Sequence, residues 1–256
     1  MVFIDINKSK PTEEHRQRVD ELLVDGYSLR NFADGYKQMY TAGRAFLPQE
    51  VETDKVPGRD GEYVKSVSSG TREIEVGFKL VAKDEQDLRE QFAKINMALR
   101  RTDGRPLKLQ FRNDDGFSID GYLTGADKIE ERSFILKGTL TFTCYDGYFY
   151  KQSDQHPVVL KYADAVIPDT LHFTPSQESC TISNGTQTLR FRDCTPGERL
   201  RLTWQTWGIK LTTMENISRM HKLVATENPE EFYVRNGTSI SISGGSLDQI
   251  LYKDVK

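Results

Sequence analysis

Four apolar residues recur at every second position between residues 72 and 80. The apolar members of this segment are Ile74, Val76, Phe78 and Leu80. Side chains two residues apart project from the same face of a β-strand, so the alternation predicts a strand with one face in a core. The same period returns in Leu107–Phe111, in Phe117–Ile119, and at Phe134, Leu136, Leu140 and Phe142, with a chain reversal at residues 113–116. We therefore expect a sheet in the first half of the chain.

Between these strands the apolar period lengthens to three and four residues. The apolar positions are Leu88, Phe92, Ile95 and Leu99, which line one stripe of an α-helix. Asp84 is a favourable N-cap, and Arg100 and Arg101 precede Asp103-Gly104, as is typical of the carboxyl end of a helix. The pattern predicts a helix over residues 84–101 that packs on the sheet.

Two segments of the first half lack this regularity. Residues 8–21 are rich in charged and amide side chains and almost free of apolar ones, which fits either a short solvated helix or a mobile extension. Residues 40–69 contain several prolines and glycines among scattered apolar residues. Their pattern predicts a long irregular arm or a hairpin outside the core.

The pattern changes near Tyr150, where a polar segment leads to Pro157. We expect a domain boundary there, with one domain in residues 1–150 and a second in residues 151–256. Asn-Gly pairs at 184–185 and 236–237 are each flanked by strand-like segments and predict two β-hairpins. Apart from a short helical pattern around residues 214–223, the second half favours an antiparallel β-sandwich, so the expected fold class is mainly β.

Composition agrees with two folded domains. A length of 256 residues is long for one sandwich, and 13 Phe and 11 Tyr supply apolar surface that disordered chains lack. The formal net charge is -3, and the absence of a basic cluster interleaved with aromatics makes nucleic acid a poor ligand. Since no apolar run is long enough for a signal peptide or a membrane span, we expect the protein to stay soluble in the cytoplasm where it is made.

The reactive residue types form no motif that indicates catalysis, a metal or a cofactor. The four histidines, His15, His156, His172 and His221, match no nucleophile or metal-binding spacing. The three cysteines are odd in number and widely spaced, so we expect them to be reduced and buried. We therefore expect no catalytic, cofactor-binding or metal-binding residues and no enzyme activity; only a spatial cluster of histidine, carboxylate and nucleophile would change this.

Trp204 and Trp207 are the candidate contact residues of the second half. An exposed tryptophan is a good stacking platform for a sugar, and β-sandwiches often carry such platforms. If one strand runs through both residues, side chains three positions apart face opposite sides. One tryptophan would then belong to the core, and the other would contact a glycan or a partner protein.

The order of features in residues 22–150 resembles the distal tail protein family of siphophages, the hub component at the tip of a non-contractile tail. The features are residues 24–32 with Asp25-Gly26 and Asn31-Phe32, the segment Val56-Pro57-Gly58, the strand at 72–80, the helix, and the closing Gly138–Tyr150. The family usually has Asp-Pro-Tyr in this closing segment, whereas this chain has Gly147 in place of the proline.

The resemblance implies assembly in the virion rather than chemistry. It implies a homo-hexameric ring around an open channel, with galectin-like second domains outside it, between the tail-tube protein and the tail-tip protein. A ring repeats one heterologous contact, so each subunit needs two different complementary patches. The arm is our candidate for one patch, through Tyr40, Phe46, Leu47, Val56 and Tyr63.

The second domain leaves two alternatives open. On the hub interpretation it holds receptor-binding proteins at the distal end of the tail or touches the host surface. On the alternative interpretation the chain is a carbohydrate-binding adhesion module that contacts cell-wall saccharide through Trp204 or Trp207.

Overall fold

The computed structural model of the chain describes residues 20–55, 57–58, 60–127, 129, 133–205, 207–224 and 228–256. The expectations for residues 8–19 and for Val56 lie outside the described residues. The chain divides into two compact units, Met1–Phe149 and Tyr150–Lys256. Among the described residues both units are built mainly from antiparallel strands, and a single α-helix belongs to the first, which confirms the predicted mainly β fold class.

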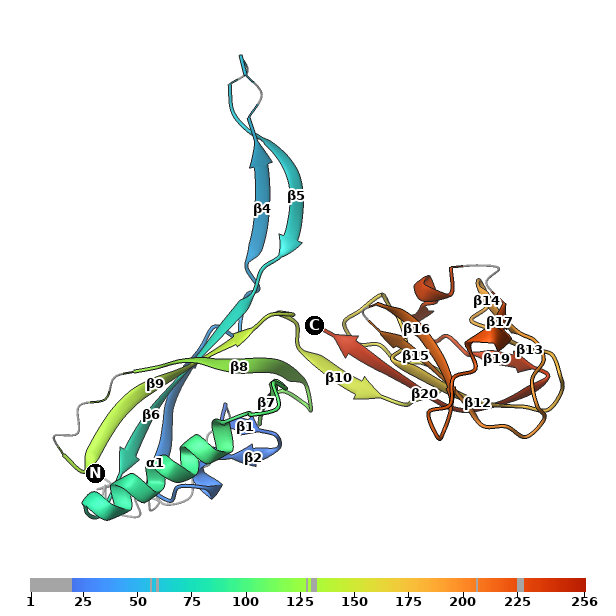
Figure 1. The fold of residues 1–256 in the computed structure, drawn as a ribbon. Coiled ribbons are helices and arrows are strands. Elements are labelled where there is room, and N and C mark those ends of the chain that lie inside the picture. The colour runs from blue at the N-terminus through green and yellow to red at the C-terminus, as the bar shows by residue number, and fades with distance from the viewer. Residues whose placement is uncertain are drawn as a thin grey trace, which may run out of the picture. The chain divides into compact units, whose positions relative to one another are not determined.

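The first unit is an antiparallel sheet that bends back on itself around one core (Figure 1). Its body strands are β1 (Leu22–Val24), β2 (Tyr27–Ser28), β3 (Tyr36–Ala42), β6 (Arg72–Val81), β7 (Leu107–Phe111), β8 (Ser118–Ala126) and β9 (Ile135–Cys144), with a 3-10 turn η2 (Leu29–Asn31). Pairing runs β2-β1-β7-β8-β9-β6-β3. The first residues of β8 pair with β7 and the later ones with β9, so β8 joins the two layers of a sandwich.

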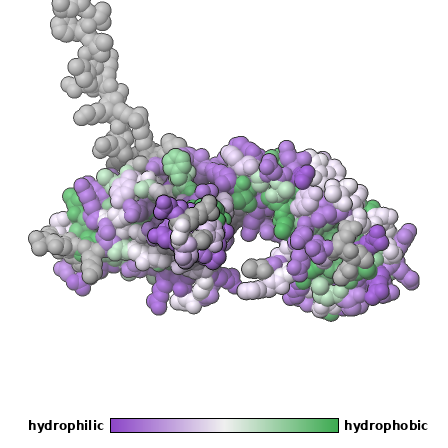
Figure 2. All heavy atoms as spheres, turned by 90° about the horizontal axis from the view of Figure 1, so that it is seen from above, coloured by the Kyte–Doolittle hydropathy of each residue, from purple (hydrophilic) through white to green (hydrophobic). Residues whose placement is uncertain are grey.

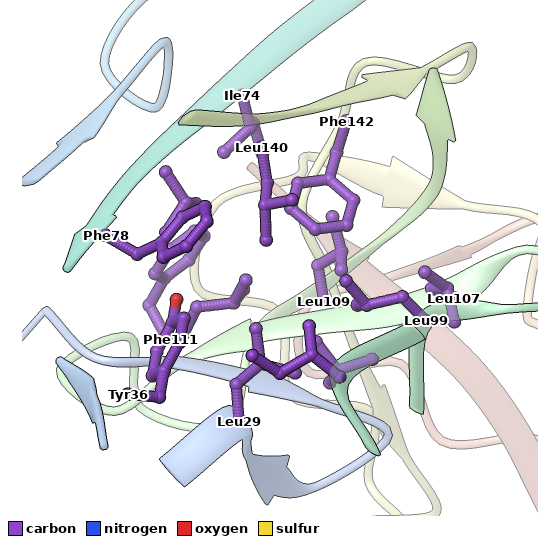
Figure 3. Close-up of a cluster of buried hydrophobic side chains, with 14 of the residues drawn as sticks. Leu29, Tyr36, Ile74, Phe78, Leu99, Leu107, Leu109, Phe111, Leu140 and Phe142 are labelled. Carbon is purple, nitrogen blue, oxygen red and sulfur yellow. The ribbon is translucent and has the colours of Figure 1, made fainter. Parts of the chain in front are cut away.

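The predicted alternation of β6 is confirmed. Ile74, Val76, Phe78 and Leu80 are all buried, and Figure 3 shows several of these side chains converging with those of β7 and β9. Phe134 is the exception among the predicted core positions, because it is 47% exposed. It lies in a bend before β9 begins, so the pleat that buries Leu136 does not extend to it.

The predicted helix is α1 (Glu85–Leu99), which packs on the core beside β7 (Figure 1). Asp84 is its N-cap, and its side chain accepts a hydrogen bond from the backbone N–H of Asp87 at 2.8 Å. The helix ends two residues before the predicted position because Arg100 already has an extended backbone. Leu88, Ile95 and Leu99 are buried, as their spacing predicts, and Phe92 is half-buried against the same core.

The second unit is a sandwich of two antiparallel sheets with a core of its own. Its strands are β10 (Tyr150–Ser153), β11 (Ala165–Val166), β12 (Thr170–Pro175), β13 (Cys180–Ser183), β14 (Thr188–Phe191), β15 (Leu200–Gln205), β16 (Gly208–Thr213), β17 (Leu223–Val224), β18 (Val234–Arg235), β19 (Ser241–Ser243) and β20 (Gly245–Val255). One sheet has the order β16-β15-β12-β20-β10 and the other β17-β14-β13-β19. The rings of Phe173 and Phe191, one from each sheet, meet with centroids 4.8 Å apart.

Two predictions for the second unit were wrong. The Asn236-Gly237 turn does not join a hairpin, because β18 before it pairs with β11 and β19 after it pairs with β13. The helical pattern around residues 214–223 corresponds only to the 3-10 turn η3 (Met220–Lys222); a second such turn is η4 (Pro229–Glu231). The hairpin at Asn184-Gly185 is confirmed by the pairing of β13 with β14.

The cysteines are free and buried, as predicted. Burial raises the pKa of the Cys144 thiol to about 12, which keeps it in the unreactive thiol form near neutral pH. On the face drawn in Figure 2, hydrophilic residues predominate and hydrophobic ones form scattered patches. In the described part of the chain, no helix has both the length and the apolar character needed to cross a bilayer.

Candidate interaction surfaces

The segment predicted as an arm is a two-stranded hairpin that projects from the first unit (Figure 1). Its strands are β4 (Gln49–Asp54) and β5 (Tyr63–Ser69), and every residue of both is exposed. Each strand pairs only with the other among the described strands. An isolated two-stranded ribbon is at best marginally stable in water. Contact with another surface would therefore stabilise this hairpin.

One face of the arm hairpin is apolar. Val51 lies opposite Val67, and Thr53 lies opposite Val64, so the three valines share one face with the threonine. Their exposed fractions are 50%, 57% and 55% for Val51, Val64 and Val67. A stripe of this kind on a protruding element is typical of a binding surface.

The opposite face of the arm hairpin is acidic. It carries Glu50, Glu52 and Asp54, with Tyr63 and two serines from β5. Glu52 accepts hydrogen bonds from Lys65 Nζ and Ser66 Oγ, each at 3.0 Å, and both contacts lower the pKa of its carboxyl. The hydroxyl of Tyr63 donates to Asp54 at 3.4 Å.

The base of the arm hairpin is held to the body by Arg72. This buried side chain donates from Nε to the carbonyl of Gly147 at 2.7 Å, and from its Nη1 to the carbonyls of Gly43 and Arg44. Desolvation lowers the pKa of the Arg72 guanidinium, whose charge these three carbonyls help to offset. The root of the arm is therefore fixed although its strands are exposed.

The residues predicted as arm contacts do not form one surface. Tyr40 lies in β3 on the body, where its ring covers Gly77 and its hydroxyl is 3.0 Å from Thr139 Oγ1. Leu47 packs at the base of the arm against Gly147, and Phe46 beside it is 89% exposed. Tyr63 alone lies on the ribbon, on its acidic face.

Sequence reasoning missed the valine stripe. Val64 and Val67 are three residues apart, so in a regular strand they would face opposite sides. The register shifts by one residue between Glu52 and Thr53, which leaves Lys65 as an extra residue and brings both valines to one face. A bulge of this kind leaves no clear signal in the apolar pattern.

A groove of about 500 Å³ lies at the carboxyl end of α1. We call it the arginine groove, and its lining is Asn96, Leu99, Arg100, Arg101, Arg105, Leu107, Tyr122 and Leu123. The lining holds three cations and no carboxylate. Arginine and tyrosine are among the residue types enriched where proteins bind proteins.

The two tryptophans of the second unit differ in environment. Trp204, near the end of β15, donates from its indole N–H to the carbonyl of Pro229 at 2.9 Å and stacks on Phe232 with centroids 5.9 Å apart. Trp207 lies in the turn before β16 and is 97% exposed. β15 ends at Gln205, so no single strand contains both residues. The two side chains therefore differ in exposure because Trp207 lies in the turn, and not because of strand alternation.

The histidines within the described residues are dispersed. His156 Nε2 accepts a hydrogen bond from the backbone N–H of Ile240 at 2.8 Å, which is a structural role. Burial and the nearby Arg201 lower the pKa of His172. Across the described part of the chain, no three His, Cys, Asp or Glu side chains gather as metal ligands do.

Comparison with known proteins gives one family match and several structural ones. Residues 34–144 match the model of the phage tail protein RIFT-related domain. No curated protein matches the sequence. The crystal structure of the Dit protein (gp 19.1) of phage SPP1, described as a paradigm of the hub adsorption apparatus in phages that infect Gram-positive bacteria, superposes with a TM-score of 0.72 at 18% identity, covering 93% of this chain and 100% of that one.

Two structures of the phage P2 baseplate in its activated conformation also match. The form with Ca gives a TM-score of 0.55 at 8% identity and covers 90% of this chain and 92% of that one. The form with Sr gives 0.58 at 9% identity and covers 92% and 98%. At these identities the likenesses establish a shared fold along nearly the whole chain.

Proposed function

We propose that the chain is a structural protein of a siphophage tail and forms the ring-shaped hub of the tail tip, because residues 34–144 match the phage tail protein RIFT-related domain. The resemblance noted over residues 22–150 is thereby confirmed. In this proposal the chain lies in the virion, at the distal end of the tail, as the domain match and the fold support. The proposed hub is a homo-hexamer that joins the tail-tube protein to the tail-tip protein around an open channel.

The exposed arm hairpin carries this proposal. Its valine stripe has no cover among the described residues of its own chain, and its root is held by buried hydrogen bonds of Arg72. A ring requires one patch that reaches a neighbour and a second patch that receives it. The valine stripe is the reaching patch, and Phe46 and Leu47 at the base of the arm and Tyr63 on its opposite, acidic face are separate contacts.

The second unit has an outer role in this proposal. A galectin-like sandwich outside the ring holds receptor-binding proteins or meets the host surface. Its two-sheet core is complete without the first unit's cluster, which suits a module attached to the outside of a ring. The proposed hub acts through assembly alone and has no enzymatic step.

Ring formation is tested by negative-stain electron microscopy of the purified chain together with its mass in solution. We expect a six-fold ring, and we expect the double variant Val51→Thr with Val67→Thr to shift the equilibrium at least tenfold towards monomer. Threonine keeps the shape and the strand propensity of valine, so the change removes only apolar contact.

Val159→Thr is the matched control, because Val159 is 53% exposed and lies on the second unit. This control variant retains the ring. A monomer at high concentration that the tail-tube and tail-tip proteins do not oligomerise would rule out the hub function.

Saccharide binding by the second unit is a second candidate function, favoured by the full exposure of Trp207. An indole with both faces in water binds the apolar face of a sugar ring. Its test is a binding assay on host cell walls, in which Trp207→Ala abolishes the signal. Trp204→Ala provides the comparison, because Trp204 is packed on Phe232 and its loss affects stability instead.

A further inference from the structure

We propose that the acidic face of the arm hairpin of one copy docks in the arginine groove of the next copy. The proposal rests on the hub function and names the two complementary patches of its repeated contact. The partner is a second copy of this chain, since both patches belong to the same sequence. A heterologous contact of this kind forms a ring without any other protein when its rotation closes.

The arm hairpin carries surplus negative charge. Residues 49–69 contain five carboxylates and three cationic side chains. Both of the described lysines are neutralised within the hairpin, Lys65 by Glu52 at 3.0 Å and Lys55 by Glu62 at 3.2 Å. Glu50, Asp54 and Asp60 form no ion pair in the described part of the chain. Glu50 and Asp54 lie on one face, so they can meet one cationic surface together.

The arginine groove has the opposite charge. Arg101 pairs with Asp25, and Arg105 pairs with Asp103 at 3.4 Å. Arg100 has no carboxylate partner among the described residues and is exposed. Each guanidinium has five N–H donors, so those already paired still have donors for a second carboxylate. The groove therefore offers an incoming acidic strand one cation that is unpaired within the described residues, Arg100, and two paired arginines with donors to spare.

The side chains beside these arginines are suited to a protein ligand. Tyr122 lines the groove, and its ring packs against the ring of Tyr145 with centroids 5.8 Å apart. The Tyr145 side chain is 63% exposed. Tyrosine on this surface can contact Tyr63 of the arriving hairpin and the stems of its carboxylates. In a single copy the hairpin projects from the first unit on the side away from α1 (Figure 1). The arm is therefore directed away from the groove of its own chain and binds the groove of a neighbouring copy.

A charge exchange tests this docking directly. The groove variant Arg100→Glu with Arg105→Glu, and the arm variant Glu50→Lys with Asp54→Lys, each weaken ring assembly at least tenfold. Mixing the two variants, or combining all four changes in one chain, restores the ring, because each contact again joins opposite charges. Assembly of the wild type also weakens between about 0.05 M and about 0.5 M salt, since exposed ion pairs are screened.

The matched control is Lys37→Glu with Lys94→Glu, which reverses two exposed cations of the same unit outside the groove. This control keeps the ring, and circular dichroism of all variants verifies that they are folded. An intact ring in the groove variant overturns the docking proposal and leaves the hub function standing. A groove variant that keeps its ring but loses the tail-tube or tail-tip protein overturns it as well, because the groove then binds another protein. A wild type that stays monomeric on its own also overturns the docking, and it counts against the hub as well only if the tail-tube and tail-tip proteins fail to oligomerise it.

Discussion

Three buried polar side chains hold the first unit together where its backbone ladders are interrupted. Gln38, at the bulge of β3, accepts from the backbone N–H of Leu22 at 2.8 Å and so ties β3 to β1. Arg72 binds the carbonyls at the root of the arm. Gln91 accepts from the N–H of Gly35 at 3.0 Å. Periodicity assigns polar residues to solvent, so these three could not be predicted from the sequence.

Gly147, which stands where the distal tail proteins that the chain resembles usually have proline, has a conformation that proline cannot adopt. Its φ is +69°, and a Cβ would lie 2.6 Å from Leu47 Cδ1 and 2.9 Å from the carbonyl oxygen of Gly70. Proline fixes φ near -65° and cannot adopt this conformation. We expect Gly147→Ala to cost about 2–4 kcal/mol of unfolding free energy, from backbone strain and overlap together. Urea unfolding of the variant and the wild type measures this loss of unfolding free energy.

Gly26→Ala is the control for the Gly147 variant. Gly26 also has a positive φ, of +86°, but a Cβ there meets nothing within 4 Å. It therefore reports backbone strain alone, about 1–2 kcal/mol. Equal losses in the two variants would show that contact with Leu47 contributes nothing.

Glu198 makes the stability of the second unit depend on pH. Burial raises the pKa of its carboxyl, but hydrogen bonds from Lys222 at 2.6 Å and Arg219 at 2.8 Å outweigh this and lower it below the ordinary 4.5. Since the pKa is lower in the folded state, the stabilisation is present above pH 4.5 and is lost as the pH falls through the folded value. We expect Glu198→Gln to cost about 2–3 kcal/mol at neutral pH and to remove this acid sensitivity.

Thermal unfolding between neutral pH and about pH 3 measures this effect. The exposed Glu178 provides the comparison as Glu178→Gln, which leaves the pH profile unchanged. A Glu198 variant whose stability falls with acid as steeply as the wild type would contradict the assignment to this carboxyl.

At the scale of elements, those defined by local signals were predictable. The apolar stripe and the N-cap Asp84 specify α1, and the Asn184-Gly185 pair specifies a hairpin, because neighbours in sequence make these contacts. The turn at Asn236-Gly237 has the same local signal, yet its flanking strands join different partners. Distant residues decide that pairing, so turn chemistry alone could not reveal it.

The attachment of α1 to the sheet depends on Gln91. Its side chain accepts from Gly35 N–H and donates to the carbonyl of Val81 at 3.3 Å and to Asp87 at 3.0 Å. We expect Gln91→Leu to destabilise the first unit by about 2 kcal/mol, because the half-buried N–H of Gly35 and carbonyl of Val81 both lose this partner. Gln86→Leu on the exposed side of the helix changes stability by less than about 0.5 kcal/mol.

Chemical denaturation followed by α1 helicity measures the effect of Gln91→Leu. If this variant is as stable as Gln86→Leu, the helix is held by its leucine stripe alone and the hydrogen bonds of Gln91 contribute nothing measurable.

At the scale of the whole molecule, composition and pattern indicated two β-rich bodies, and the structure divides between Phe149 and Tyr150. The order of features over residues 22–150 also indicated the resemblance to phage tail proteins, and residues 34–144 match such a domain. The contact surfaces were less accessible to prediction. The valine stripe depends on a bulge. The arginine groove brings together Arg100 and Tyr122, which are distant in sequence and become neighbours through the packing of α1 and the pairing of β7 with β8. Surfaces depend on tertiary neighbours that a linear pattern does not contain.

The arm hairpin also bears on how the free subunit survives before assembly. Each of its strands leaves one edge without a backbone partner among the described residues, and such edges are templates for uncontrolled sheet growth between copies. The bulge at Lys65 interrupts the flat ladder, and the carboxylates of β4 repel a second β4 laid alongside it. The same charges that favour a neighbour's groove therefore protect a newly made chain from aggregation.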